Sequence, residues 1–501
     1  MALIIGAGST KPTNPYDKYY GIIERNWKTR TSQTFEAVNP DLMADSANPW
    51  WMRIRSFIEN PDGSVKYYLD RYDSRYREGG TAKADLTGKS GNVMVEIPEH
   101  YVRIEYHGDD RYRLYSDYPL PGFKYVPRRV ISKFHASRYT GTTVAGSALV
   151  NTGLCSVSLL QWDNMAYMQV NSGDESPIKR HTITSGDISY KTPYFGEVGS
   201  AEHTLAEQLR GGNVSGTTLD ETYHSELGMC RTGISRTEYR TDANNVNKYH
   251  GISDVTKMLH IGAFHILNEL AWAARCKYLN YDIQNVADFG EGSAAKLASS
   301  TWSTWGGGQY EPFLPCGVTA PLGDRTGYLI YKLEMANGTE TNIKCGTLFG
   351  VELPIAYIWH NCDDLLVYNT TEELHCYICK DPAKFATPAD SAAESWAEEH
   401  GYELVATLPM FASGNSGYYK NESVDEDGNS YPRETGGGAT SGVGDYFYHI
   451  TNPTTAASKG WFCCLLGGHA SFGAGAGFGY LNAAVRPAYT DANIGARLCR
   501  N

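Results

Sequence analysis

The cysteine and histidine side chains are the groups in this chain best suited to metal or redox chemistry. Cys376 and Cys379 form a CxxC pair beside His375, which supplies at most half of a zinc site. No second CxxC or HxxxH follows at a suitable spacing, and the alternation in EELHCYICKD favours a buried strand. The eleven cysteines are odd in number and too sparse for a disulfide scaffold. We therefore expect mostly free, buried thiols, with no bound metal or cofactor.

Other short motifs give no support for catalysis. The chain has no GxSxG, Walker loop, HExxH or paired-carboxylate signature, so we do not expect an enzyme. Trp162, Asp163 and Asn164 spell the WND triplet of calcium-dependent, sugar-binding lectins. No EPN or QPD loop precedes that triplet, and we interpret it as a chance match.

The C-terminal segment has the most unusual composition in the chain. Residues 462–501 contain no Lys, Glu, Gln, Met or Trp, although all five types occur throughout the rest of the sequence. Codons that end in a pyrimidine encode every amino acid except these five. The pattern is therefore the one expected if asparagine codons (AAC) had their adenines randomised while the third base stayed fixed. The alternative is an ordinary Gly/Ala-rich segment that lacks long side chains by chance.

The segment LLGGHASFGAGAGFGYLNAAVRPAYTDANIGARLCRN resembles the variable region of proteins diversified by retroelements. The GG step, the AG step and IGARLC match the constant positions of such regions. Between them lies an irregular mixture of rings, charges and amides, which we interpret as variable, ligand-binding positions within a variable region at 467–499. They are His469, Ser471, Phe472, Phe478, Tyr480, Asn482, Val485, Arg486, Tyr489 and Asp491.

The resemblance extends upstream over most of the chain. VMVEIPEHYVRIEY, YSDYPLPGFKYVPR, TGISRTEYRTDANN, LAWAARCKYLNYDIQNV, LPCGVTAPLGDRTGYLIY and CGTLFGVELPIAYIWHNCDD occur in this order. They resemble the C-type-lectin-like domain of phage tail-fibre and tropism proteins, akin to the major tropism determinant family. The resemblance implies a homotrimer that displays its variable residues to a host-cell receptor, either protein or glycan, and that contacts other tail proteins of the virion.

We expect constant residues of the segment to hold its backbone while the variable ones face solvent together. Glycine permits positive φ and close approach of backbones, and Ile494 and Leu498 are expected to pack inward. The constant residues, hereafter the frame residues, are Gly467, Gly468, Gly473, Gly477, Ile494, Gly495 and Leu498.

The rest of the sequence predicts an α+β fold with few helices and many loops. Ser235 and Glu238 form a capping box, so a helix should begin there. A second helix should be capped by Ser253 or Asp254, because apolar residues recur at helical spacing from Val255 to Ala274. Short Tyr/Val/Ile-rich runs broken by Gly, Pro, Asn and Asp predict strands elsewhere.

The length of 501 residues and the extent of the resemblance suggest two domains. We expect residues 1–88 to form a small β-rich attachment or oligomerisation domain. Residues 89–501 should form the lectin-like domain, with large insertions at 138–228 and 384–445. The second insertion contains SAAESWAEEHGYEL, which predicts a local helix.

Charge and hydropathy limit the partners. The net charge of −12 argues against nucleic acid and anionic membrane surfaces, both of which attract basic patches. No apolar run is long enough to span a membrane, and MALIIGAGST lacks the features of a secretory signal. We therefore expect a protein assembled in the host cytoplasm and carried in the virion, at the tail or tail-fibre tip.

Two other functions remain open from sequence. One is a structural virion protein, such as a baseplate or decoration piece, whose lectin-like domain has a fixed specificity. The other is an enzyme of the formylglycine-generating class, because Cys463 and Cys464 beside Trp461 resemble lectin-like relatives that oxidise a cysteine with copper. A second position matching the copper-binding cysteine pair of those enzymes is missing from the sequence.

Overall fold

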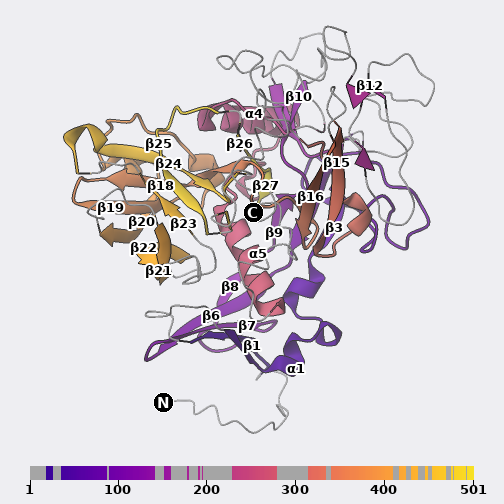
Figure 1. Cartoon of the computed structure of the whole chain (residues 1–501), viewed down its shortest axis with the longest axis horizontal. Coiled ribbons are helices and arrows are strands. Elements are labelled where there is room, and N and C mark those ends of the chain that lie inside the picture. Colours follow the sequence, from indigo (N-terminus) through magenta and orange to yellow (C-terminus); the bar gives the residue numbers. More distant parts are fainter. Residues whose placement is uncertain are drawn as a thin grey trace.

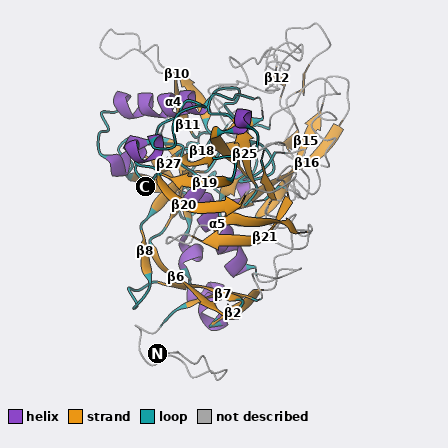
Figure 2. Ribbon diagram, turned by 90° about the vertical axis from the view of Figure 1, so that its left-hand side faces the viewer, coloured by secondary structure: helices purple, strands orange, loops and turns teal. Residues whose placement is uncertain are grey.

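The computed structural model has a mixed α+β fold, mostly of strands, as the sequence predicts (Figure 1). Two long helices, α4 (Arg236–Tyr249) and α5 (Phe264–Lys277), lie among the sheets. Figures 1 and 2 both show α5 between α4 and the sheet that contains β6 and β7. The structure describes residues 18–25, 35–86, 88, 90–140, 152–158, 178–179, 190–191, 194–195, 228, 230–278, 314–334, 340–409, 417–424, 430–437, 446–449, 454–469, 476–477, 479–491 and 493–501.

Two five-stranded sheets contain the strands of the first third of the chain, and one of them also contains the C-terminal strand β27. Their orders are β2-β1-β7-β6-β8 and β27-β9-β5-β3-β4. Strands from both sides of residue 88 pair within each sheet, so the expected division into 1–88 and 89–501 does not separate two sets of sheets. The strands are β1 (Tyr20–Glu24), β2 (Phe35–Val38), β3 (Arg55–Glu59), β4 (Val65–Tyr68), β5 (Asn92–Ile97), β6 (His100–His107), β7 (Asp110–Ser116), β8 (Lys124–Val126), β9 (Arg129–Ser132) and β27 (Cys499–Arg500).

The largest sheet contains the C-terminal strands. Its order is β20-β19-β18-β24-β25-β23-β21-β22, and β26 pairs in parallel with β18. Three of its strands come from 384–445, so the described part of that expected insertion belongs to this sheet. The predicted local helix there is the short α8 (Trp396–Glu399). The strands are β18 (Trp359–Asn369), β19 (Glu373–Ile378), β20 (Glu403–Pro409), β21 (Gly417–Val424), β22 (Ser430–Gly437), β23 (Tyr446–Tyr448), β24 (Gly460–Leu466), β25 (Leu481–Val485) and β26 (Ile494–Gly495).

Smaller elements complete the described fold. The expected insertion at 138–228 lies mostly outside the described residues. Near its start, β10 pairs with β11 in an antiparallel ribbon that packs beside α4. The remaining elements are α1 (Pro40–Met43), β10 (Ser137–Thr140), β11 (Thr152–Cys155), β12 (Ile178–Lys179), β13 (Tyr190–Lys191), β14 (Tyr194–Phe195), β15 (Gly327–Glu334), β16 (Glu340–Leu348), β17 (Val351–Glu352) and the 3₁₀ turns Asp45–Ala47, Trp50–Arg53, Val255–Lys257, Ala320–Leu322, Pro382–Lys384 and Ala456–Ser458.

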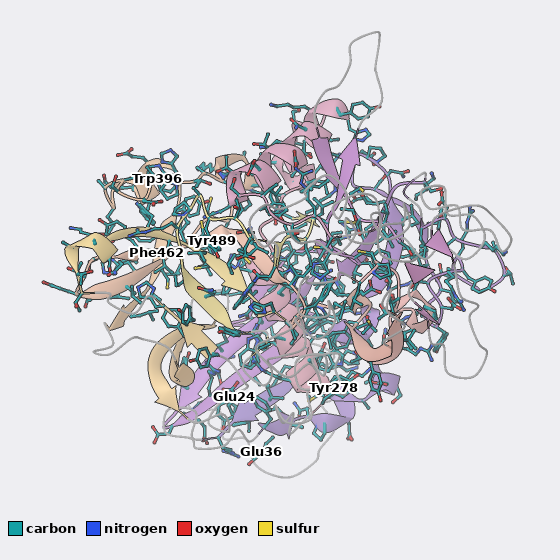
Figure 3. All side chains as sticks on the ribbon, turned by 45° about the horizontal axis from the view of Figure 1, so that its top comes forward. Glu24, Glu36, Tyr278, Trp396, Phe462 and Tyr489 are labelled. Carbon is teal, nitrogen blue, oxygen red and sulfur yellow. The ribbon has the colours of Figure 1, made fainter. Side chains whose placement is uncertain are left out.

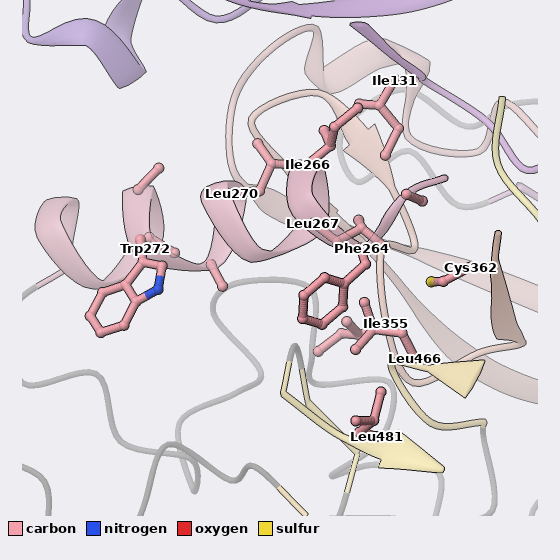
Figure 4. Packing of buried hydrophobic residues seen from close by; sticks show 14 of the residues in the cluster. Ile131, Phe264, Ile266, Leu267, Leu270, Trp272, Ile355, Cys362, Leu466 and Leu481 are labelled. Carbon is pink, nitrogen blue, oxygen red and sulfur yellow. The ribbon is translucent and has the colours of Figure 1, made fainter. Parts of the chain in front are cut away.

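Helix α5 is the centre of the main hydrophobic core. Almost all of its side chains are buried, and they contact strands of three different sheets. Figure 4 shows Phe264 and Leu267 facing Leu466 and Leu481 of the large sheet, with Ile131 of β9 beyond Ile266. A helix that is buried on nearly every side has to be covered by neighbouring elements around its whole circumference. The helix therefore ties the large sheet to the two sheets built from the first third of the chain.

One buried carboxylate on α5 forms ionic hydrogen bonds with the sheet that contains β6 and β7. Glu269 accepts hydrogen bonds from His100 at 3.1 Å and from Arg113 at 3.2 Å. Burial alone would raise the pKa of Glu269, but Arg113 and His100 outweigh it and hold the pKa at about 2. The carboxylate is therefore ionised and partnered, as a buried charge has to be.

The two predicted helix starts have different outcomes. The capping box at Ser235 is confirmed, because its hydroxyl accepts from the Glu238 amide while Glu238 accepts from the Ser235 amide. The second prediction is wrong about the start. Asp254 caps only the 3₁₀ turn Val255–Lys257, and α5 begins at Phe264. Its first amides point instead at Asp364, a residue 100 positions away in the sequence.

Candidate ligand-binding surface

The frame residues hold the C-terminal segment against two sheets. Ile494 and Leu498 are fully buried, which confirms that they pack inward. Gly467 and Gly468 follow β24 with φ values of 96° and 77°, which a side chain would strain. A Cβ on Gly468 would also lie 2.7 Å from Cβ of Ala476. The backbone before and after the variable positions is therefore fixed by burial and by close approach. Gly473 lies outside the described residues.

The described variable positions fall into three groups, before, on and after β25. Asn482 and Val485 lie on the strand itself, with Val485 packed against buried residues below it. His469 and Tyr480 precede the strand, whereas Arg486, Tyr489 and Asp491 follow it. Six residues of extended chain separate Tyr480 from Arg486 by about 20 Å. The described positions are therefore spread along β25 and the residues on either side of it. Ser471, Phe472 and Phe478 lie outside the described residues.

The group after β25 forms an exposed turn, on which Figure 3 labels Tyr489. Tyr489 is 46% exposed, and its amide donates to the carbonyl of Arg486 at 2.9 Å. Its hydroxyl donates to Oδ2 of Asp491 at 2.9 Å. Burial and then the Asp491 carboxylate raise the pKa of Tyr489 to about 12, so the hydroxyl stays protonated at neutral pH. The turn therefore presents an aromatic ring and a carboxylate together.

Arg486 anchors the same turn to the sheet below it. Its guanidinium donates to the carbonyls of Ala457 and Trp461, each at 3.1 Å, and lies 4.1 Å from the centre of the Phe462 ring. Such cation–π contact adds to the hydrogen bonds. The half-buried Arg486 side chain therefore stabilises the turn through these contacts.

Tyr480 does not face solvent, which corrects the expectation for this residue. It is 1% exposed, and its ring packs edge-on against Trp359 at 4.8 Å and Tyr446 at 5.1 Å between centroids. His469 also packs edge-on against Trp359, at 5.9 Å. Burial lowers the pKa of His469 to about 4, so its ring is neutral at neutral pH. These two positions belong to the packed side of the segment.

Sequence reasoning missed the aromatic residues that surround the segment. Trp359 of β18 contacts both His469 and Tyr480, and Tyr448 of β23 pairs with Asn482 and is partly exposed. The alternation in Tyr446, Phe447 and Tyr448 is a strand signal that could have been recognised. The pairing of that strand with β25 could not, because the two are far apart in sequence.

The cysteines are buried thiols, as predicted. All eleven are free and buried. Cys376 and Cys379 pack into two different hydrophobic clusters, and burial raises the pKa of both. His375 lies between Glu373 and Glu394 instead. Within the described residues, no three His, Cys, Asp or Glu side chains gather to hold a metal ion.

The pair Cys463 and Cys464 is equally buried. Both side chains are buried, and burial raises the pKa of each thiol although Arg236 lies close to them. Arg236 donates to Sγ of Cys463 at 3.4 Å and forms an ion pair with Asp363. A neutral thiol is a poor nucleophile and a poor metal ligand. The WND triplet at 162–164 lies outside the described residues.

The sequence matches no protein-family model and no curated protein. In the part of the chain that the structure describes, no helix is long and apolar enough to cross a membrane. The geometry of the C-terminal segment therefore carries the functional argument.

Proposed function

We propose that this chain is a bacteriophage receptor-binding protein of the tail-fibre or tropism-determinant type, with a C-type-lectin-like fold and a hypervariable C-terminal surface. One observation carries the proposal. Tyr489 is exposed on a turn that buried frame residues hold, within a segment lacking the five residue types that pyrimidine-ending codons cannot encode. The exposed turn and the codon pattern are independent of each other, and both favour a surface that changes while its backbone stays fixed.

Binding at this surface requires no covalent chemistry. An exposed tyrosine supplies a large, rigid contact area and a hydroxyl at its tip, and the adjacent Asp491 supplies an acceptor. Ile494 and Leu498 lie on the buried side of the same segment, so exchange of residues 482, 489 or 491 would change the exposed chemistry with little effect on packing. Fewer side chains would be tolerated at the positions before β25, because Tyr480 is buried in the hydrophobic core.

We further propose that the protein acts as a homotrimer in the virion, at the tail or tail-fibre tip, where it also contacts other tail proteins. Three copies of a weak site would give firm attachment if host receptors are dense enough for simultaneous engagement. The net charge of −12 suits a soluble particle that avoids nucleic acid and anionic membranes.

The experiment that tests this function is to sequence the 3′ end of the gene, with its flanking genome, in many progeny of a single clone. We expect substitutions confined to codons 469–493, at sites where a nearby non-coding repeat carries adenine, beside a reverse transcriptase gene. An invariant segment with no repeat would contradict the proposed diversification. It would favour a structural virion protein of fixed specificity.

A further inference from the structure

Tyr448 is a large exposed side chain directly beside one of the variable positions. β23 pairs in parallel with β25, and the register places Tyr448 opposite Asn482. Residues that pair across a sheet have their side chains on the same face. Tyr448 is 39% exposed and Asn482 is partly exposed, whereas the preceding pair, Phe447 and Leu481, is buried on the opposite face. Tyr448 therefore lies on the same outward face as variable position 482.

Tyr448 is also a fixed neighbour of that position. It precedes the segment 467–499, so the proposed diversification would not change it. The next residue, His449, donates through Nδ1 to the carbonyl of Ala483 at 2.7 Å. Burial lowers the pKa of His449 to about 4, so its ring is neutral at neutral pH and keeps this backbone contact. Because the contact involves a backbone carbonyl of β25, exchange of the side chain at 482 would leave Tyr448 in place.

The outward face around Tyr448 is uncharged and amphipathic. On β25, Asn482 and Ala484 face the same way as Tyr448. Oδ1 of Asn482 accepts from the Ala484 amide at 2.9 Å, which orients the side-chain amide and leaves its Nδ2 group as the donor for a ligand. A flat ring beside an amide donor matches a ligand that has an apolar face and hydroxyl groups around its edge.

A pyranose sugar has this shape. Its C–H groups carry partial positive charge and can contact the negative face of an aromatic ring, while its hydroxyls bond to amide groups. A protein partner would instead favour an aromatic anchor that other contacts shield from water. The residues next to Tyr448 on β25 offer only an amide and a methyl group. The face therefore favours a glycan over a protein.

We propose that Tyr448 is a constant part of the receptor surface and stacks on a sugar ring of a host-cell glycan, with Asn482 donating to a hydroxyl of the same sugar. This inference rests on the receptor-binding function proposed above and names the class of the receptor. The variable residues would then select among sugars. The ring of Tyr448 supplies a contact that every variant of the segment shares.

Treated host cells test the class of receptor. Binding of the fluorescently labelled full chain is measured by flow cytometry on cells oxidised with periodate, which cleaves vicinal diols of sugars, and on cells digested with proteinase K. We expect periodate to abolish binding and proteinase K to leave it unchanged. Loss of binding after proteinase K, with none after periodate, would show a protein receptor. That result would overturn the glycan assignment but not receptor binding.

Variants of Tyr448 test the stacking contact in the same assay. Tyr448→Phe keeps the ring and should bind as the wild type does. Tyr448→Ala and Tyr448→Leu should each bind at least about tenfold more weakly, because neither offers an aromatic face. Tyr328→Ala is the matched control, because Tyr328 is 40% exposed and lies on β15, outside the large sheet. It should bind normally.

The outcomes separate this inference from the proposed function. Normal binding by Tyr448→Leu would overturn the stacking contact, since leucine keeps apolar bulk without a ring. This comparison also decides if Tyr448→Ala lowers the melting temperature. Normal binding by Tyr448→Ala, with a loss in Tyr489→Ala, would exclude Tyr448 while the proposed function stands. Failure of the wild type to bind host cells would overturn both.

Discussion

Tyr480 and Tyr489 have opposite surroundings although both lie in the C-terminal segment. Tyr480 is enclosed by Trp359 and Tyr446, whereas Tyr489 stands on the turn after β25. The composition of the segment singles out both residues equally, because it carries no information about which side of the strand is covered. The residues that cover Tyr480 come from β18 and β23, and only the fold brings them there.

Replacing Tyr489 by alanine should reduce binding of the purified protein to host cells at least about tenfold, since an exposed ring at a recognition surface is a typical binding hot spot. Flow cytometry with the fluorescently labelled protein measures this binding. Tyr72 is the matched control, because it is 69% exposed and lies outside the segment. Equal binding by Tyr489→Ala and the wild type would exclude Tyr489 from the proposed receptor surface.

Replacing Tyr480 by alanine should instead lower the free energy of unfolding by about 3 kcal/mol, because it leaves a cavity beside Trp359. Urea denaturation followed by tryptophan fluorescence measures the change. Tyr489→Ala is the control and should alter stability by less than about 0.5 kcal/mol. If both variants were equally stable, the packed role of Tyr480 would be refuted.

At the scale of elements, the sequence is most informative where an element is stabilised by its own neighbours. The capping box at Ser235 and Glu238 lies within four residues, so α4 begins where the sequence predicts. Helix α5 begins later than predicted because Asp254 stabilises only a 3₁₀ turn, whereas the first amides of α5 point at Asp364 of β18. A distant capping group leaves no local signal.

The reason for the glycine in β26 also lies in residues that are distant in the sequence. A glycine at position 495 could allow either a positive φ or a close approach of neighbouring chain segments. The structure shows the close approach. Gly495 has no positive φ, but a Cβ there would lie 2.8 Å from Sγ of Cys230 and 3.1 Å from Cγ2 of Ile358. The parallel pairing of β26 with β18 therefore depends on the absence of a side chain.

Gly495→Val should destabilise the protein by about 2 kcal/mol or more, because the added carbons overpack the contact between β26 and its neighbours. Differential scanning calorimetry gives the change in melting temperature. The control is Ala488→Val on the exposed turn, where no such change is expected. A melting temperature equal to that of the wild type would show that the space around Gly495 is larger than the structure indicates.

At the scale of the whole molecule, the last strand of the chain, β27, completes a sheet whose other strands come from residues 55–132. β27 pairs with β9, and Arg500 donates through Nε to the buried carboxylate of Glu59 in β3 at 2.8 Å. The expected domain boundary at residue 88 could not foresee this, because strands pair across hundreds of residues without a matching motif. The fold class was predictable because it depends only on local patterns of apolar residues, turns and caps.

Arg500→Leu should lower the free energy of unfolding by about 3 kcal/mol, since it leaves the Glu59 carboxylate buried without its partner. The double variant Glu59→Leu/Arg500→Leu should recover more than half of that loss, because it removes the unpaired charge as well. Arg25→Leu, which breaks the partly exposed pairs of Arg25 with Glu36 and Asp110, should cost less than about 1 kcal/mol. Guanidinium denaturation compares all four proteins. A double variant no more stable than Arg500→Leu would contradict the pairing.

Because β27 lies at the C-terminus, its formation also depends on an intact reading frame through the whole C-terminal segment. The ribosome makes Cys499 and Arg500 only after the whole segment 467–498, so the sheet of β3, β5 and β9 lacks its edge strand until that segment is complete. A frameshift anywhere in the segment would replace both residues and leave β9 uncovered. If the segment is copied with errors, folding itself would discard the copies with a broken reading frame and pass on those that carry substitutions alone.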